Sequence, residues 1–447
     1  MRLWRRLPGA AKQRRACRSI DPQPKPGAPL RPHARHIILK TTVRCFPWAT
    51  RRSSLIACNI SANLTALPTL TALSMDIAAT GQNHPPARGL FGPWADVMLL
   101  GGGSLVAMAV LQMMDLENTG LATLSLIMLG LANLVNHPHF AFSYQLFYGS
   151  WSDVKENRWP PDLRRRWMIA GVIAPVALAA CLVTGAVLSV NGQSMVLALS
   201  VTAMGLLVGW HYVKQGFGMA MMDGALKKRF WPAETRKALL LNAYACWGAA
   251  WTLGNGSSLG RQIWGVLGVH YTVPPLATIV ACATAGLTTV WCGLAVFRCV
   301  SQWRAQQLSW TQWPAAGLLA YFITLYVWLG LVWTRPAFLL VIPFFHSLQY
   351  LTVVSKYKVN EARARQWSGA RLAGFVFTGA VLGGLGFWML PGLVDYARTG
   401  QMPGQGVALT VACAWIFINV HHYLIDNVLW RQGNPKVKQF LFDAQPR

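Results

Sequence analysis

The stretch 167–190, WMIAGVIAPVALAACLVTGAVLSV, contains 24 consecutive residues without a charge. A helix needs roughly 20 apolar residues to cross a bilayer. Similar stretches recur along the chain of 447 residues, which is 54% hydrophobic and only 12% charged. Soluble domains carry about 25% charged residues. The sequence therefore predicts an all-α protein, a polytopic helix bundle embedded in a membrane.

We predict ten transmembrane helices, separated by clusters of Gly, Pro and polar residues. Lysines and arginines are distributed unevenly between the loops, because 21 follow the even-numbered helices and three follow the odd-numbered ones. Cytoplasmic loops carry the excess of positive charge, so both termini are predicted to lie in the cytoplasm and the bundle in the inner (cytoplasmic) membrane. The predicted helices cover 93–113, 119–140, 167–190, 194–218, 238–254, 274–297, 314–333, 336–354, 370–392 and 405–428.

The two ends of the chain are predicted to lie outside the bundle of residues 93–431. Residues 1–92 form a basic extension, predicted to be disordered, of which 1–74 contain 14 Lys and Arg and one acid. This segment is either an arginine-rich targeting peptide or upstream of the true start at Met75, which we favour. Residues 432–447 are predicted to be a short cytoplasmic tail. The net charge of +26 follows the positive-inside pattern, so we expect no nucleic-acid partner.

The histidines gather near one end of the predicted bundle. Six of the ten lie near the cytoplasmic ends of predicted helices 2, 4, 8 and 10. Ionisable groups inside a membrane are costly and usually mark function. A single buried histidine is more often structural, but six at one depth favour a shared metal site. The predicted ligands are His137, His139, His211, His346, His421 and His422.

Other polar residues near these histidines are predicted to support the site. Asp426 lies four residues after His422 on the same helix face, and either ligates the metal or orients a histidine. Lys214 either extends to the interface or binds an anionic head group or substrate carboxylate. Pro138 is expected to break helix 2. We predict catalytic roles for Tyr144, Lys214 and Asp426, and orienting roles for Asn136, Gln215, Gln349 and Asn419.

The chemistry of imidazole limits which metals and which reactions the site could support. A site rich in imidazole suits iron, copper or zinc rather than magnesium or calcium. At a lipid boundary the natural substrates are hydrophobic small molecules that enter from the bilayer, and the demanding reaction there is oxygen activation by non-haem iron. We therefore predict an iron-dependent oxygenase or related oxidoreductase with a lipidic substrate and a possible electron donor. Helices 2, 4, 8 and 10 should surround the metal, with helix 6 outside.

The histidine-bearing segments NHPHF, HYVKQ, FHSLQY and HHYLID each lie near the end of a predicted helix. In this layout the chain resembles integral-membrane histidine-rich oxygenases. It is similar to bacterial carotene-cleaving dioxygenases of the Brp/Blh type and, more distantly, to membrane fatty-acid desaturases and hydroxylases. The resemblance implies that the six histidines are ligands of non-haem iron.

Three alternatives remain open from the sequence. A transporter or channel would place ionisable groups near the middle of the membrane, where this chain has almost none. A haem protein for electron transfer would use two axial histidines and leave four unexplained. A lipid hydrolase or transferase would use zinc-bound water as its nucleophile.

Overall fold

The computed structural model describes residues 89–114, 116, 118–400, 408–431 and 433–443, and these residues form helices and no strand. The predicted all-α fold is confirmed for this part of the chain, whereas residues 1–88, including the alternative start at Met75, lie outside it. Eight helical stretches are long and apolar enough to cross a membrane. They are α1–η1–α2 (Pro93–Met113), α3–η2–α4–α5 (Thr119–Lys155), α6–η3–α7 (Pro161–Val190), α8 (Met195–Leu226), α11 (Pro275–Ala305), α14 (Pro336–Ala364), α15–η6–α16 (Gly369–Thr399) and α17 (Leu409–Leu429).

Two of the ten predicted spans fall outside this group of eight. The predicted span 238–254 lies within α9 (Ala233–Gly256), which begins with charged residues and buries Asn242 and Asn255. The predicted span 314–333 corresponds to a shorter apolar helix over Ala315–Leu331. Both segments are helical, but their composition or length differs from that of a full span. The ten-helix topology and the cytoplasmic termini therefore stay predictions.

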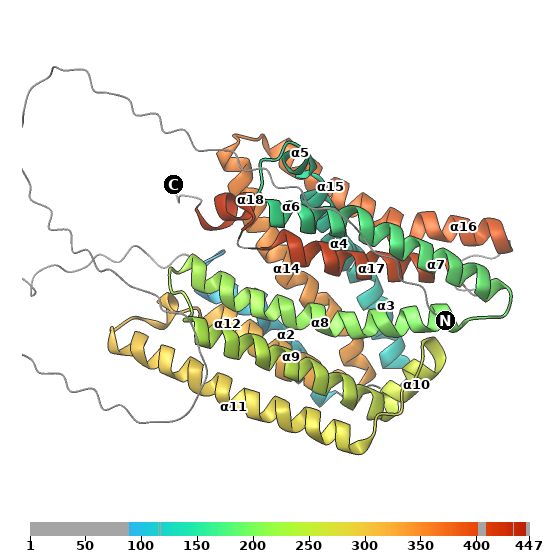
Figure 1. Cartoon of the computed structure of the whole chain (residues 1–447), viewed down its shortest axis with the longest axis horizontal. Coiled ribbons are helices and arrows are strands. Elements are labelled where there is room, and N and C mark those ends of the chain that lie inside the picture. Colours follow the sequence, from blue (N-terminus) through green and yellow to red (C-terminus); the bar gives the residue numbers. More distant parts are fainter. Residues whose placement is uncertain (1–88, 115, 117, 401–407, 432, 444–447) are drawn as a thin grey trace, which may run out of the picture. The chain divides into compact units, whose positions relative to one another are not determined.

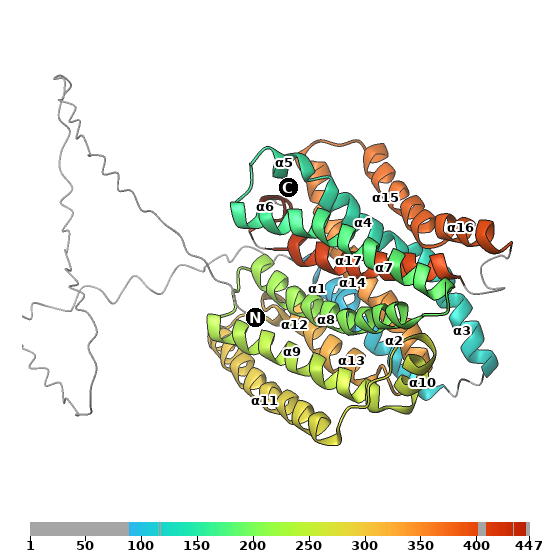
Figure 2. The ribbon, with the colours of Figure 1, turned by 45° about the vertical axis from the view of Figure 1, so that its right-hand side comes forward.

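The helices pack side by side in one bundle (Figure 1). Figures 1 and 2 both place α11 and α9 on one side and α15 and α16 (Leu390–Thr399) on the other, with α14 and α17 between them. The main packing partner of α11 is α9. The α17 helix contacts α8, α7 (Ala174–Val190) and α4 (His137–Tyr148). The centre of the bundle is thus formed by helices that carry the predicted site residues.

The helix that carries Pro138 runs on through this proline. A π-helical segment, η2 (Ala132–Asn136), leads directly into α4, where Pro138 occupies the first turn. In a regular α-helix a proline removes one hydrogen bond and its ring clashes with the carbonyl group four residues earlier. The wider π-helical turn accommodates both effects, so the predicted break between His137 and His139 is wrong. Single π-helical turns are frequent at functional sites.

Close contact between α4 and α15 (Gly369–Gly384) depends on two glycines spaced four residues apart. A Cβ atom at Gly379 would lie 2.0 Å from the Phe142 ring, and one at Gly383 would lie 2.8 Å from the backbone of His137. Small residues at this spacing allow membrane helices to approach closely. The two glycines therefore allow α15 to pack closely against α4, the helix that carries His139.

The segment predicted as a tail is packed against the bundle up to residue 443. Asn434 caps α18 (Pro435–Val437), and η7 (Lys438–Phe442) follows. Phe440 and Leu441 are buried, and the carbonyl group of Phe440 accepts a hydrogen bond from the side chain of Asn360 at 2.8 Å. This segment covers one end of the bundle, and several of its side chains line the cavity described below.

Candidate metal centre

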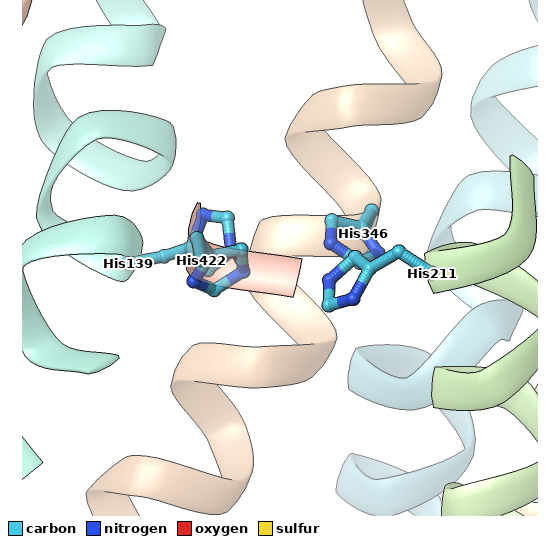
Figure 3. A group of neighbouring side chains, drawn as sticks. All are labelled: His139, His211, His346 and His422. Carbon is cyan, nitrogen blue, oxygen red and sulfur yellow. Dashed lines mark hydrogen bonds between the residues drawn. The ribbon is translucent and has the colours of Figure 1, made fainter. Parts of the chain in front are cut away.

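Four histidines from four different helices converge inside the bundle. They are His139 on α4, His211 on α8, His346 on α14 and His422 on α17. One ring nitrogen of each lies within 4.8 Å of the corresponding nitrogen of every other. Figure 3 shows the four rings pointing toward one another. Each side chain is at most 4% exposed, so the group is shielded from the surroundings of the protein.

The ring of His139 is oriented by hydrogen bonds on the side that faces away from the other histidines. Its Nδ1 lies 2.9 Å from the carbonyl oxygen of Asn136 and 3.0 Å from the hydroxyl group of Ser347. A carbonyl oxygen only accepts, so Nδ1 carries the proton and Nε2 keeps a free lone pair. That Nε2 lies 3.0 Å from Nε2 of His422. Metal-binding histidines show the same arrangement, with one nitrogen held by the protein and the other free for the metal.

Several buried ring nitrogens in the group have no hydrogen-bond partner in the structure. They are Nε2 of His211, Nδ1 of His346 and Nδ1 of His422. A buried polar atom without a partner costs about 1–3 kcal/mol, and such atoms are rare in native proteins. A bound cation would satisfy those orphan nitrogens that face the group. Nδ1 of His422 is not one of them, because this ring presents its Nε2 to His139.

Aromatic side chains hold the rings of the group in place. Tyr423 stacks on His211 with ring centroids 4.5 Å apart, and Tyr212 stacks on His346 at 4.3 Å. The ring of Phe140 packs edge-on against His422 at 4.6 Å. These contacts restrict rotation of the imidazoles without occupying their nitrogens.

Asp426 lies beside the four histidines, as its spacing from His422 predicts. Its Oδ2 is 3.3 Å from Nε2 of His422. Its Oδ1 accepts a hydrogen bond from the hydroxyl group of Tyr350 at 3.3 Å, and Tyr350 in turn accepts one from Ser143. The sequence reasoning missed Ser143 and Ser347. Ser143 lies one turn after His139 on the same helix face, and this spacing is the signal that would have identified it. No sequence signal points to Ser347, because its contacts with Asn136 and His139 depend on the packing of two helices.

Three of the four predicted orienting residues are amides that link helices or fix aromatic rings. The side-chain amide of Gln215 on α8 donates to the backbone carbonyl of His346 at 2.9 Å and to Oε1 of Gln349 at 3.0 Å. Gln349 also donates to the carbonyl group of Leu100. Asn419 accepts a hydrogen bond from the Tyr423 hydroxyl at 3.0 Å. None of these three side chains contacts a ring nitrogen, so they position backbone and tyrosines rather than imidazoles.

The fourth predicted orienting residue, Asn136, acts on the group more directly. Its carbonyl oxygen holds His139, as described above, and its side-chain oxygen accepts a hydrogen bond from Ser347 at 2.6 Å. Ser347 therefore bridges Asn136 and His139. This arrangement joins η2 to α14 beside the histidine group.

His421 and Tyr144 lie outside the histidine group, which corrects the prediction of one six-histidine site. Nε2 of His421 lies 2.9 Å from the carbonyl oxygen of Ala170, and its Nδ1 lies 2.9 Å from the hydroxyl group of Tyr144. Both ring nitrogens are therefore engaged by the protein. Consecutive residues of an α-helix are turned by about 100°, so His421 and His422 cannot face the same point.

His137 also lies outside the group. Its ring stacks on Phe387 with centroids 4.3 Å apart, and its Nδ1 is 3.1 Å from the side-chain oxygen of Asn133. Residues two apart on a helix point in nearly opposite directions, so His137 faces α15 and η6 (Leu385–Met389) while His139 faces the centre. It is a packing residue at this interface.

A cavity of about 390 Å³ reaches the histidine group from one side. His211 and Asp426 lie in its wall, together with Lys214, the third predicted catalytic residue. The ammonium group of Lys214 lies 5.9 Å from the centroid of the Phe217 ring. Lys214 is therefore part of the cavity wall and not of the histidine group.

No protein-family model, curated protein or solved structure shows significant similarity to the chain. The function must therefore be inferred from the site. Four buried imidazoles with a carboxyl group beside them could hold a transition-metal ion. The cavity adjoins this group at His211 and Asp426.

Proposed function

We propose that the four histidines bind one transition-metal ion. The observation that carries the proposal is the convergence of four buried imidazoles, of which His211 and His346 each have a ring nitrogen without a hydrogen-bond partner. Ligand nitrogens about 2.0–2.1 Å from a metal lie about 3–4 Å from one another. The nitrogens here lie within 4.8 Å, so small rotations of the rings bring them to bonding distance. One ion fits this space, and two metal ions about 3.5–4 Å apart would need more ligands.

Iron is the metal that we propose, in a non-haem site. Imidazole ligands suit iron, copper and zinc, and histidines with a neighbouring carboxylate and open positions are typical of non-haem iron oxygenases. Two axial histidines of a haem would need a porphyrin in the plane between them. The other two histidines of the group fill that space, so the geometry favours a bare ion over haem.

We propose that the protein is a membrane-embedded oxygenase, or a related oxidoreductase, with a lipidic substrate. When bound, iron would supply the capacity to activate oxygen. The chain provides a cavity whose wall is largely apolar, with methionines at 219, 221 and 222 and phenylalanines at 217 and 442. A long hydrocarbon chain fits such a wall better than a polar metabolite does. An electron donor is required if the reaction incorporates one oxygen atom and reduces the other.

Asp426 and Tyr350 have defined tasks in this proposal. Both line the cavity, and the hydrogen bond between them fixes the carboxyl group beside His422. Asp426 is thus placed to accept or deliver a proton at the cavity wall. Tyr350 is a positioning residue, because its hydroxyl group donates a hydrogen bond to the carboxyl group of Asp426. The same hydroxyl group accepts a hydrogen bond from Ser143.

A zinc-dependent lipid hydrolase is the second candidate function. The position of Asp426 favours it, because a carboxylate beside a metal-bound water can serve as a general base. A transporter or channel is less well supported, since the four buried histidines and Asp426 are gathered in one group rather than distributed along a pathway. The 21-to-3 distribution of basic residues supports a location in the cytoplasmic membrane, with this end of the bundle toward the cytoplasm.

Metal analysis tests the proposed function. The full chain is purified in detergent under reducing, anaerobic conditions, and its metals are measured by mass spectrometry together with its absorption spectrum. We expect about one iron per chain, no Soret band, and oxygen uptake on addition of a membrane lipid extract. Stoichiometric zinc, with release of a hydrolysis product, would favour the second candidate. Failure to retain any metal after reconstitution with iron(II), copper or zinc would overturn the metal site.

A further inference from the structure

We infer that the cavity beside the histidines binds a lipid with an anionic head group, and that three cations in its wall recognise this group. The cations are Lys214 on α8, Arg236 on α9 and Arg431 directly after α17. This inference deepens the proposed function by naming the substrate class. It rests on that proposal for the reaction, but the binding itself is tested without metal.

The three cations have no carboxylate partner among the ion pairs of the described residues. Arg236 donates one hydrogen bond to the carbonyl group of Trp231 at 3.3 Å, and Arg431 donates one to that of Asn427 at 3.2 Å. A guanidinium group has five N–H donors, so most of them stay available to a ligand. Within the described part of the chain, the ammonium group of Lys214 contacts the Phe217 ring and forms no ion pair.

The electrostatic surroundings of Arg431 support the presence of an anion. Burial and the charge of Arg166 lower the pKa of Arg431, so the protein itself does not compensate this cation. Asp426 is the one carboxyl group in the cavity wall, and it is engaged by His422 and Tyr350. A carboxylate or phosphate group from outside would complete the charge balance.

The cations and the histidine group lie at a fixed separation along two helices. Arg431 lies two residues after the end of α17, and its side chain donates a hydrogen bond to the carbonyl group of Asn427, the neighbour of Asp426. Lys214 follows His211 by one turn. A head group held by these cations therefore places the first carbons of its chain near the metal ligands and the rest along the apolar wall.

The apolar part of the wall suits a flexible chain. Met219, Met221 and Met222 contribute unbranched thioether side chains, and Val437 and Leu441 from the C-terminal segment close the other side. Methionine adapts to irregular ligands because it has three rotatable bonds and a polarisable sulfur. The cavity wall contains both cations and apolar side chains. It therefore suits an amphipathic molecule with an anionic head group better than a neutral hydrocarbon.

Binding of simple lipids to the full chain in detergent tests this inference. The probes are palmitate, hexadecyl phosphate and hexadecanol, which share a 16-carbon chain and differ in the head group. We expect at least one of the two anions to bind about tenfold more tightly than the alcohol. The preferred anion shows whether a carboxylate or a phosphate is recognised. Equal binding of all three probes would overturn the inference.

Variants identify the cations responsible. Lys214→Gln, Arg236→Gln and Arg431→Gln should each weaken binding of the preferred anion about three- to tenfold and leave binding of hexadecanol unchanged. Lys237→Gln is the matched control, because Lys237 is adjacent to Arg236 and exposed like it, but does not line the cavity. A loss of the same size in the control would assign the effect to general surface charge and contradict the inference.

The histidine variant His346→Leu separates this inference from the proposed function. His346 belongs to the metal group but not to the cavity wall. Preference for the anion should persist in this variant, which lacks a complete ligand set. A chain that binds no metal but prefers the anion would disprove the metal site and keep the inference. A chain that binds iron but binds the anions and the alcohol equally well would support the metal site and disprove the inference.

Discussion

Nε2 of His139 lies 3.0 Å from Nε2 of His422, although 283 positions separate the two residues in the chain. The contact joins α4 to α17, and His211 and His346 complete the group from two further helices. Burial of four imidazoles in an apolar bundle costs free energy, because each ring gives up its hydrogen bonds to water. The proposed metal ion would give all four histidines one shared role.

Replacement of His346 by leucine should remove metal binding without destabilising the protein. Nδ1 of His346 has no hydrogen-bond partner, so an apolar side chain of similar size removes an unsatisfied atom. We expect iron per chain to fall at least tenfold, while the thermal unfolding midpoint of the metal-free protein stays equal or rises. Metal is measured by mass spectrometry and unfolding by tryptophan fluorescence. Retention of full metal occupancy would exclude His346 from the ligand set.

His421→Phe tests the separation of the neighbouring histidine from the site. This variant leaves the Ala170 carbonyl and the Tyr144 hydroxyl group without their partner. We expect a loss of about 1–3 kcal/mol in the free energy of unfolding, with unchanged iron per chain. His137→Phe serves as a second variant outside the group and should also retain iron. Loss of metal in either one would restore the six-histidine site.

Gly383→Ala should destabilise the bundle, whereas Gly384→Ala should not. A Cβ atom at Gly383 would meet the backbone of His137 at 2.8 Å, which cannot move without shifting α4. Overpacking of this kind costs about 1–3 kcal/mol. A Cβ atom at Gly384 meets nothing within 4 Å, so alanine there should be neutral or slightly stabilising. Equal unfolding midpoints for the two variants would argue against the close α4–α15 contact.

Asp395→Ala should weaken the start of α17, the helix that carries His422. The carboxyl group of Asp395 accepts hydrogen bonds from the backbone N–H groups of Thr410 and Val411, each at 3.0 Å. Removal of such a cap costs about 0.5–2 kcal/mol. Asp395→Asn keeps an acceptor and should lose less stability. Hydrogen exchange at residues 409–412 should increase in the alanine variant and provides the local measurement.

The sequence predicted the helices that build the site more reliably than the site residues themselves. Long apolar stretches located α8, α14 and α17 and the helical stretch that leads into α4, and all four helices contribute a histidine to the group. The predicted count of ten spans includes α9, which is helical but is not among the eight stretches long and apolar enough to cross a membrane. The polar side chains of α9 find their partners only in the tertiary structure. Asn242, for example, donates to the hydroxyl groups of Tyr321 and Tyr326.

The sequence by itself determined the position of each histidine along its helix, because that position follows from counting residues. It did not determine which way each ring faces, because the rotation of a helix about its axis is set by the packing of its neighbours. Only the tertiary structure therefore placed His422 at the centre and His421 against Ala170, and likewise His139 at the centre and His137 against Phe387. The cavity and its three cations also required the fold, since they combine side chains from helices that are distant in the chain.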